Sequence, residues 1–199
     1  AGIKSSTDAK VGVRDYLLAP KITLPPQLSK IQEAMRGGIR STGAIINVIG
    51  KTSIGKTLFS DTLVYYWIFN SPLKPVIFSI ERTAEELLID MYSIHLKQNL
   101  TWFSDGQDAV EYLNQPDVVK KCEEVETNEL GEQRFYIIDE RKGNANALKK
   151  QIEKAIKQHN SKLVILDVLT DVLRSLPLSE QDDFMLWQKQ MKKEGVVFI

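Results

Sequence analysis

The stretch AIINVIGKTSIGKTLF, residues 44–59, is the most informative part of this 199-residue chain. Residues 44–49 form an apolar, β-branched run, which predicts a buried strand. Gly50 to Thr57 then fits the pattern G-x-x-x-x-G-K-[S/T], and a very apolar helix is expected from Lys56 to Asn70. A strand, a glycine-containing loop and a helix in this order place backbone N–H groups around a phosphate. The stretch therefore predicts a nucleotide-binding domain.

Each part of this loop has an expected role. Gly50 and Gly55 let the backbone turn tightly, and Lys56 is expected to reach the β- and γ-phosphates. The Thr57 hydroxyl is expected to bind Mg²⁺. The predicted nucleotide contacts are Gly50, Lys51, Thr52, Ser53, Ile54, Gly55, Lys56, Thr57 and Leu58. The expected ligand is ATP or another NTP, with Mg²⁺.

Four further apolar runs predict four more strands, and the segments between them predict helices. The runs cover residues 75–80, 134–139, 162–167 and 195–199, and the helices cover 83–98, 145–159 and 179–194. Thr83 and Glu86 form a capping box, and Ser179 is the expected N-cap of the last helix. Strands that are apolar throughout, separated by helices, predict an α/β fold with a mostly parallel sheet and helices on both faces.

The chain is expected to divide into an N-terminal arm or linker, residues 1–22, and a core, residues 23–199. The arm segment VGVRDYLLAP (11–20) is apolar without a long periodic run, which is typical of a short helix that docks on another surface. Because the chain ends at Ile199 within an apolar run, we expect the core to be incomplete at its C-terminal end.

Acidic residues follow three of the predicted strands. Asp167 ends the run LVILD and is expected to hold Mg²⁺ at the carboxyl edge of the sheet. Glu81 ends the run at 75–80, and a carboxylate there can orient and deprotonate an attacking water if its strand neighbours the first one. Asp139 and Glu140 follow the third strand in the same way, and the residues alone do not separate them from Glu81 as the catalytic acid.

Composition sets limits on function. The chain has 26 basic and 26 acidic residues, whereas nucleic-acid-binding domains are usually basic. Any contact with DNA is therefore expected to use local loops or segments outside this chain. No run of 18 apolar residues is present, so no membrane span is predicted. Cys122 is the only cysteine, which excludes an internal disulfide and favours a reducing compartment.

Three segments resemble the RecA-type core of DnaB-type replicative helicases, in the order and spacing of that family. They are QLSKIQEAMRGGIRSTGAIINVIGKTSIGKT (27–57), VIFSIERTAEELLIDMYSIHL (76–96) and FYIIDERKGNANALKKQIEKAIKQHNSKLVILDVLTDVL (135–173). Phage primase-helicases and the mitochondrial helicase Twinkle belong to the same superfamily 4. The resemblance covers residues 23–199 and implies a RecA-like P-loop NTPase core, truncated at its C-terminal end.

The resemblance also implies roles for single residues. Glu81 matches the family's catalytic glutamate, which favours it over Asp139, and Asp167 matches its Mg²⁺-coordinating acid. The implied assembly is a homo-oligomer, a hexameric ring that binds ATP between subunits and threads single-stranded DNA, with a primase or polymerase of a replisome as partner. The arm would pack on a neighbouring subunit. The implied compartment is the cytoplasm of a bacterium or phage-infected cell, or a mitochondrion.

Three other functions share the same loop. A RecA/RadA- or KaiC-like ATPase would have the same core without unwinding activity. A small-molecule kinase needs an Arg-rich lid. The segment 104–133 has an arginine only at its edge, Arg134, so the sequence does not support such a lid. A non-hydrolysing assembly subunit is disfavoured because Glu81 and Asp167 are both present.

Overall fold

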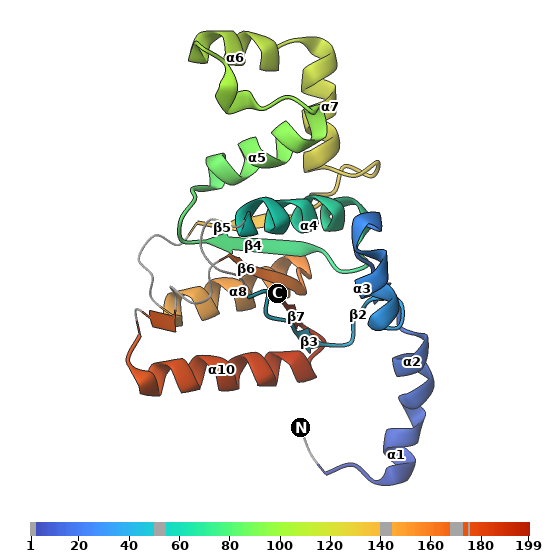
Figure 1. Ribbon diagram of the computed structural model, residues 1–199. Coiled ribbons are helices and arrows are strands. Elements are labelled where there is room, and N and C mark those ends of the chain that lie inside the picture. Colours follow the sequence, from blue (N-terminus) through green and yellow to red (C-terminus); the bar gives the residue numbers. More distant parts are fainter. Residues whose placement is uncertain (1–2, 50–54, 140–144, 168–172, 175) are drawn as a thin grey trace.

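A five-stranded parallel sheet forms the centre of the molecule (Figure 1). The computed structural model describes residues 3–49, 55–139, 145–167, 173–174 and 176–199. The strands are β3 (Ala44–Ile45), β4 (Pro75–Ser79), β5 (Tyr136–Ile138), β6 (Leu163–Asp167) and β7 (Val197–Phe198). Their order is β3-β7-β6-β4-β5, and every neighbouring pair is parallel. The predicted α/β fold with a parallel sheet is confirmed.

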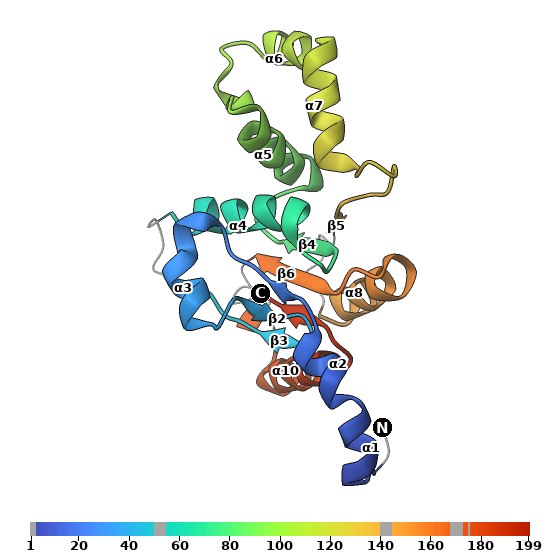
Figure 2. The same ribbon diagram turned by 90° about the vertical axis from the view of Figure 1, so that its right-hand side faces the viewer.

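Helices cover both faces of this sheet, as predicted. Helices α4 (Lys56–Asn70) and α5 (Ala84–Leu96) lie on one side, and α8 (Ala145–His159) and α10 (Leu178–Lys193) lie on the other (Figure 1, Figure 2). Alternate residues of one strand point to opposite faces. Ile77 of β4 therefore packs with α4 and α5, whereas Val76 and Phe78 pack with α8 and α10. This explains why the central strands are apolar throughout.

Between α5 and β5 the chain projects away from the sheet, at the top of Figure 1. This part contains η2 (Leu100–Trp102), α6 (Gly106–Leu113) and α7 (Pro116–Glu126). Helix α7 packs against α5, and the Tyr92 hydroxyl donates a hydrogen bond to Glu126 across that contact. The capping box of α5 is present: Thr83 accepts from the Glu86 N–H, and Glu86 accepts from the Thr83 N–H.

The N-terminal part begins with two short helices, α1 (Ser6–Val11) and α2 (Val13–Leu18), neither of which has a buried residue. Strand β1 (Lys21–Ile22) then pairs antiparallel with β2 (Ile39–Arg40), and η1 (Pro26–Leu28) and α3 (Ser29–Ala34) lie between them. Ile22 is fully buried in the cluster that contains α4. The division of the chain at residue 22 stays a prediction.

Two local expectations were wrong. The first strand covers only Ala44–Ile45, and the last hydrogen bond of its ladder runs from the Ile46 N–H to the Phe198 carbonyl. Ile49, expected inside a buried strand, is 92% exposed. The N-cap of α10 is Pro177 rather than Ser179, because the N–H groups of residues 180 and 181 already donate to the Pro177 carbonyl.

Candidate nucleotide-binding site

The start of α4 is where the predicted phosphate loop enters a helix. Gly55 is the N-cap residue and has left-handed backbone angles, φ 82° and ψ 22°. A Cβ at Gly55 would meet no atom of the described residues within 4 Å. The first N–H groups of a helix have no partner inside it and favour anions. Lys56 and the exposed Thr57 and Leu58 form this first turn. Gly50, Lys51, Thr52, Ser53 and Ile54 lie outside the described residues.

A cavity of about 440 Å³ lies beside this helix start. Lys56 of α4 and Asp167 at the end of β6 both line it, so the fold brings together two predicted site residues that are far apart in the sequence. Most of its wall is apolar and comes from the segment after β3, from α4, β6 and α10, and from residues 173–174. The apolar lining includes Ile46, Val48, Phe59, Leu63, Trp67, Ile165, Leu173 and Met185.

The predicted metal ligands fit the way in which Mg²⁺ binds beside a nucleotide. Mg²⁺ is usually held by one or two protein oxygen ligands together with substrate phosphates and water. Asp167 lines the cavity together with Lys56, whereas Thr57, in the first turn of α4, is not among the described residues that line it. Among the residues that the structure describes, no group of three or more His, Cys, Asp or Glu side chains could hold a metal ion. The assignment of Thr57 and Asp167 as ligands of Mg²⁺ stays a prediction.

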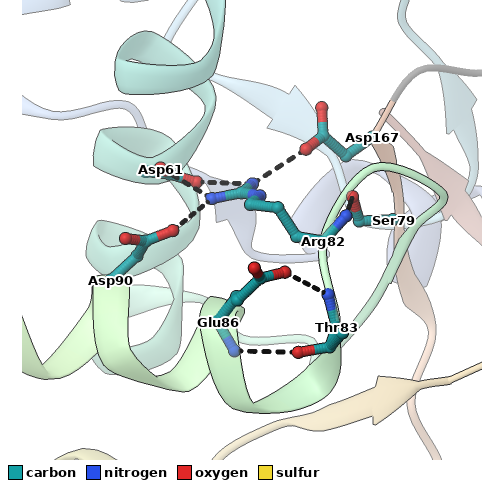
Figure 3. Close-up of polar contacts among 7 residues, drawn as sticks. All are labelled: Asp61, Ser79, Arg82, Thr83, Glu86, Asp90 and Asp167. Carbon is teal, nitrogen blue, oxygen red and sulfur yellow. Dashed lines mark hydrogen bonds and ion pairs between the residues drawn. The ribbon is translucent and has the colours of Figure 1, made fainter. Parts of the chain in front are cut away.

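Asp167 has a partner that the sequence analysis did not identify. Figure 3 shows the Arg82 guanidinium between three aspartates, and Arg82 Nη2 donates to Asp167 Oδ2 at 2.8 Å. Asp61 contacts both terminal nitrogens, at 2.9 Å from Nη1 to Oδ2 and at 2.9 Å from Nη2 to Oδ1. Asp90 accepts from Nη1 at 2.7 Å. One guanidinium therefore ties β6, α4 and α5 to the segment that follows β4.

Burial and charge act in opposite directions within this cluster. Burial raises the pKa of Asp61, and the hydrogen bond and charge of Arg82 lower it by less. Burial acts to lower the pKa of Arg82, but the three aspartates raise it by more, with Asp61 contributing most, so the net pKa lies above its ordinary value. The guanidinium is therefore charged, and its partners hold it in place although little of it meets solvent.

The position of Glu81 differs from the one that the sequence analysis assumed. Its strand does not neighbour β3; β7 and β6 lie between β3 and β4. Strand β4 instead pairs with β6, where Ser79 lies opposite Asp167, and the exposed Glu81 follows two residues after Ser79. Asp139 follows β5, which in the described sheet pairs with β4 and lies one strand further from Asp167. Glu140 lies outside the described residues. The strand order therefore supports Glu81 over Asp139 as the acid beside Asp167.

Two signals could have pointed to the cluster. Asp61 is the only charged residue between Thr57 and Asn70, on a helix that is otherwise very apolar. A charge at a buried position needs a partner of opposite sign. Arg82 is the residue next to Glu81 at a strand end, where charged side chains gather at the functional edge of a parallel sheet. Neither signal identifies the partner, which depends on strand order.

The features described so far are those of a P-loop-type nucleotide-binding domain. They are a parallel sheet, a helix that starts behind a left-handed glycine, and a lysine and an acid that line one cavity. Residues 24–186 match the family of DnaB-like helicase C-terminal domains, and the chain belongs to this family of P-loop NTPases. The predicted resemblance and the RecA-like fold are thereby confirmed.

A solved structure agrees with this fold. The chain is similar to a KaiC-like protein from the hyperthermophilic archaeon Pyrococcus horikoshii, with 18% sequence identity and a TM-score of 0.56. The similarity covers 91% of this chain and 68% of that one, and at this identity it supports the fold alone. No curated protein matches the chain significantly. No helix in the described part of the chain is long and apolar enough to cross a membrane.

Proposed function

We propose that this chain is the NTP-hydrolysing motor core of a ring-shaped replicative helicase that translocates on single-stranded DNA. The observation that carries the proposal is that Lys56 and Asp167 line one cavity at the start of α4. Membership of this P-loop NTPase family supports nucleotide hydrolysis. The DNA and ring parts of the proposal follow from the resemblance to DnaB-type helicases, whose rings act inside bacterial, phage-infected or mitochondrial compartments.

The site residues divide the chemistry among them. Lys56 and the N–H groups at the start of α4 bind the phosphates of ATP or another NTP. Thr57 and Asp167 hold Mg²⁺, which when bound neutralises charge on the β- and γ-phosphate oxygens. Glu81 orients the attacking water and accepts its proton. Gly50 to Ile54 complete the phosphate loop.

The exposed apolar side chains of the N-terminal helices support assembly into a ring. Val11, Leu17 and Leu18 are 79%, 69% and 70% exposed on α1 and α2. An unpartnered apolar surface of this kind is typical of a protein–protein contact. We propose that this arm packs on a neighbouring subunit of a homohexamer, with a primase or polymerase as a further partner.

A second candidate is a RecA/RadA- or KaiC-like ATPase without unwinding activity. The equal numbers of basic and acidic residues favour it, because they give no electrostatic preference for DNA. Both candidates use the same nucleotide site. They differ in whether single-stranded DNA is coupled to hydrolysis.

ATP hydrolysis measured with and without single-stranded DNA separates the two. We expect the helicase to hydrolyse ATP at least about tenfold faster with DNA, and Lys56→Ala to lose hydrolysis because it loses a phosphate contact. Stimulation by DNA would lead to a strand-displacement assay on a forked duplex. Hydrolysis that is lost in Lys56→Ala but indifferent to DNA would favour the second candidate.

A further inference from the structure

We propose that Arg82 competes with Mg²⁺ for Asp167, and that Asp61 and Asp90 hold the Arg82 side chain once Asp167 is released. This makes Arg82 a positioning residue that sets how much Mg²⁺ the nucleotide site requires. The inference rests on the proposed function of Asp167 as the acid that holds Mg²⁺. It concerns a residue next to Glu81 rather than a group that touches the nucleotide.

The contacts of the guanidinium show how the exchange can occur. Arg82 Nη2 is shared between Asp167 Oδ2 at 2.8 Å and Asp61 Oδ1 at 2.9 Å. Nη1 contacts Asp61 Oδ2 at 2.9 Å and Asp90 Oδ2 at 2.7 Å, so its contacts do not involve Asp167. When Asp167 is released, both terminal nitrogens therefore keep a carboxylate partner. Nη1 keeps its hydrogen bonds to Asp61 and Asp90, and Nη2 keeps its ion-pair contact with Asp61 Oδ1 at 2.9 Å. The exchange therefore leaves neither nitrogen buried without a carboxylate beside it, which would be costly.

Charge balance favours the same exchange. One guanidinium faces three carboxylates, which is a formal excess of two negative charges in a poorly hydrated place. Asp61 and Asp167 have side chains that are only 10% and 9% exposed, so water screens their repulsion weakly. A divalent cation at Asp167 would match this excess. Arg82 and the metal are thus alternative counter-charges for one carboxylate, and Asp61 and Asp90 hold Arg82 in either state.

The rest of Arg82 is arranged for a side-chain movement with a fixed backbone. Its N–H donates to Ser79 Oγ at 3.2 Å, and Ser79 lies opposite Asp167 in the β4–β6 pairing. The backbone at Arg82 is therefore tied to the end of β4. Its Nε is buried and has no hydrogen-bond partner among the described residues, so the present arrangement leaves one donor unsatisfied. A small rotation of the side chain changes its partners without moving the strand.

Binding of a fluorescent ATP analogue to the whole chain, titrated with Mg²⁺ at constant ionic strength, tests this inference without an activity readout. In Arg82→Gln the competitor is gone, and we expect half-maximal Mg²⁺ to fall by about fivefold or more. In Asp90→Asn one of the two alternative partners of the guanidinium loses its charge, so Arg82 stays more with Asp167 and half-maximal Mg²⁺ should rise by about twofold or more. Asp108→Asn on α6, an exposed aspartate outside the cluster, makes the same charge change and should leave the value unchanged.

Opposite shifts of half-maximal Mg²⁺ in the two variants would support competition between Arg82 and Mg²⁺. A merely structural role of Arg82 predicts no opposite shifts. Unshifted values, shifts in one direction, or a higher requirement in Arg82→Gln would overturn it. If Arg82→Gln does not fold, Asp90→Asn decides alone, since Asp90 is 38% exposed and Arg82 keeps two partners. A wild-type chain that binds no nucleotide with Mg²⁺ would overturn the proposed function as well, whereas normal wild-type binding with unshifted variants overturns this inference only.

Discussion

Replacing Gly43 with alanine should destabilise the chain strongly, because the backbone leaves no room for a Cβ. Gly43 precedes β3 with a φ of +124°, and a Cβ would lie 2.1 Å from the carbonyl oxygen of Lys192 and 3.1 Å from its carbon, at the end of α10. These are backbone atoms, so no side-chain rotation relieves the overlap. The strained φ and the overpacking together should cost about 3 to 5 kcal/mol. For a chain of this length that corresponds to a fall in Tm of about 6 to 20 °C.

Thermal and urea unfolding of Gly43→Ala would measure this cost, with Gly131→Ala as the matched control. Gly131 also has a positive φ, +75°, but a Cβ there would meet nothing within 4 Å. The free energy of unfolding of the control should therefore fall by only about 1 to 2 kcal/mol, because alanine disfavours left-handed backbone angles. Equal losses in the two variants would refute the claim that contact with the Lys192 carbonyl, rather than φ, dominates. A fully stable Gly43→Ala would refute the close approach of β3 to α10.

Three further outcomes follow from contacts in the structure. Glu81→Gln should bind ATP normally and stop hydrolysis, whereas Asp139→Asn should keep most of the rate; the reverse result in single-turnover assays would move the base to Asp139. Trp67→Phe loses the bond from Nε1 to the Thr23 carbonyl at 2.8 Å and part of a fully buried ring, so urea unfolding should show a loss of about 2 to 4 kcal/mol. Burial and the nearby carboxylate of α7 raise the pKa of Tyr92 above its ordinary value of 10.0. The neutral Tyr92 phenol therefore makes its full contribution to stability below pH 10.0, and this contribution is lost as the pH rises above that value. Unfolding curves of Tyr92→Phe at alkaline pH should not show this fall in stability.

Several elements could be predicted because their signals are local. The helix from Lys56 to Asn70 and the capping box at Thr83 and Glu86 appear as expected. Each depends on residues within one or two turns, and the local sequence contains all of the interacting groups. The parallel sheet could be predicted for a similar reason, because apolar strands separated by helices form a sheet that is covered on both faces. The roles of the phosphate-loop residues stay predictions.

Other features depended on which strands become neighbours. The apolar run at 44–49 contains the signal for a strand but not which of its residues pair with another strand, so the extent of the strand was overestimated. The sequence did not show that β6 and β7 separate the strand before Glu81 from β3. Strand order is decided by packing among residues that are far apart in the chain, and no local period records it.

The amino-acid sequence by itself determined the phosphate-loop motif, the alternation of strands and helices, and the acids at the strand ends, because each is a pattern of neighbouring residues. Only the tertiary structure placed Asp167 on one cavity with Lys56 and joined it to Arg82, Asp61 and Asp90. The physical reason is that an ion pair forms wherever folding brings opposite charges within a few ångströms in a poorly hydrated place. Sequence separation has no bearing on that distance once the sheet has formed.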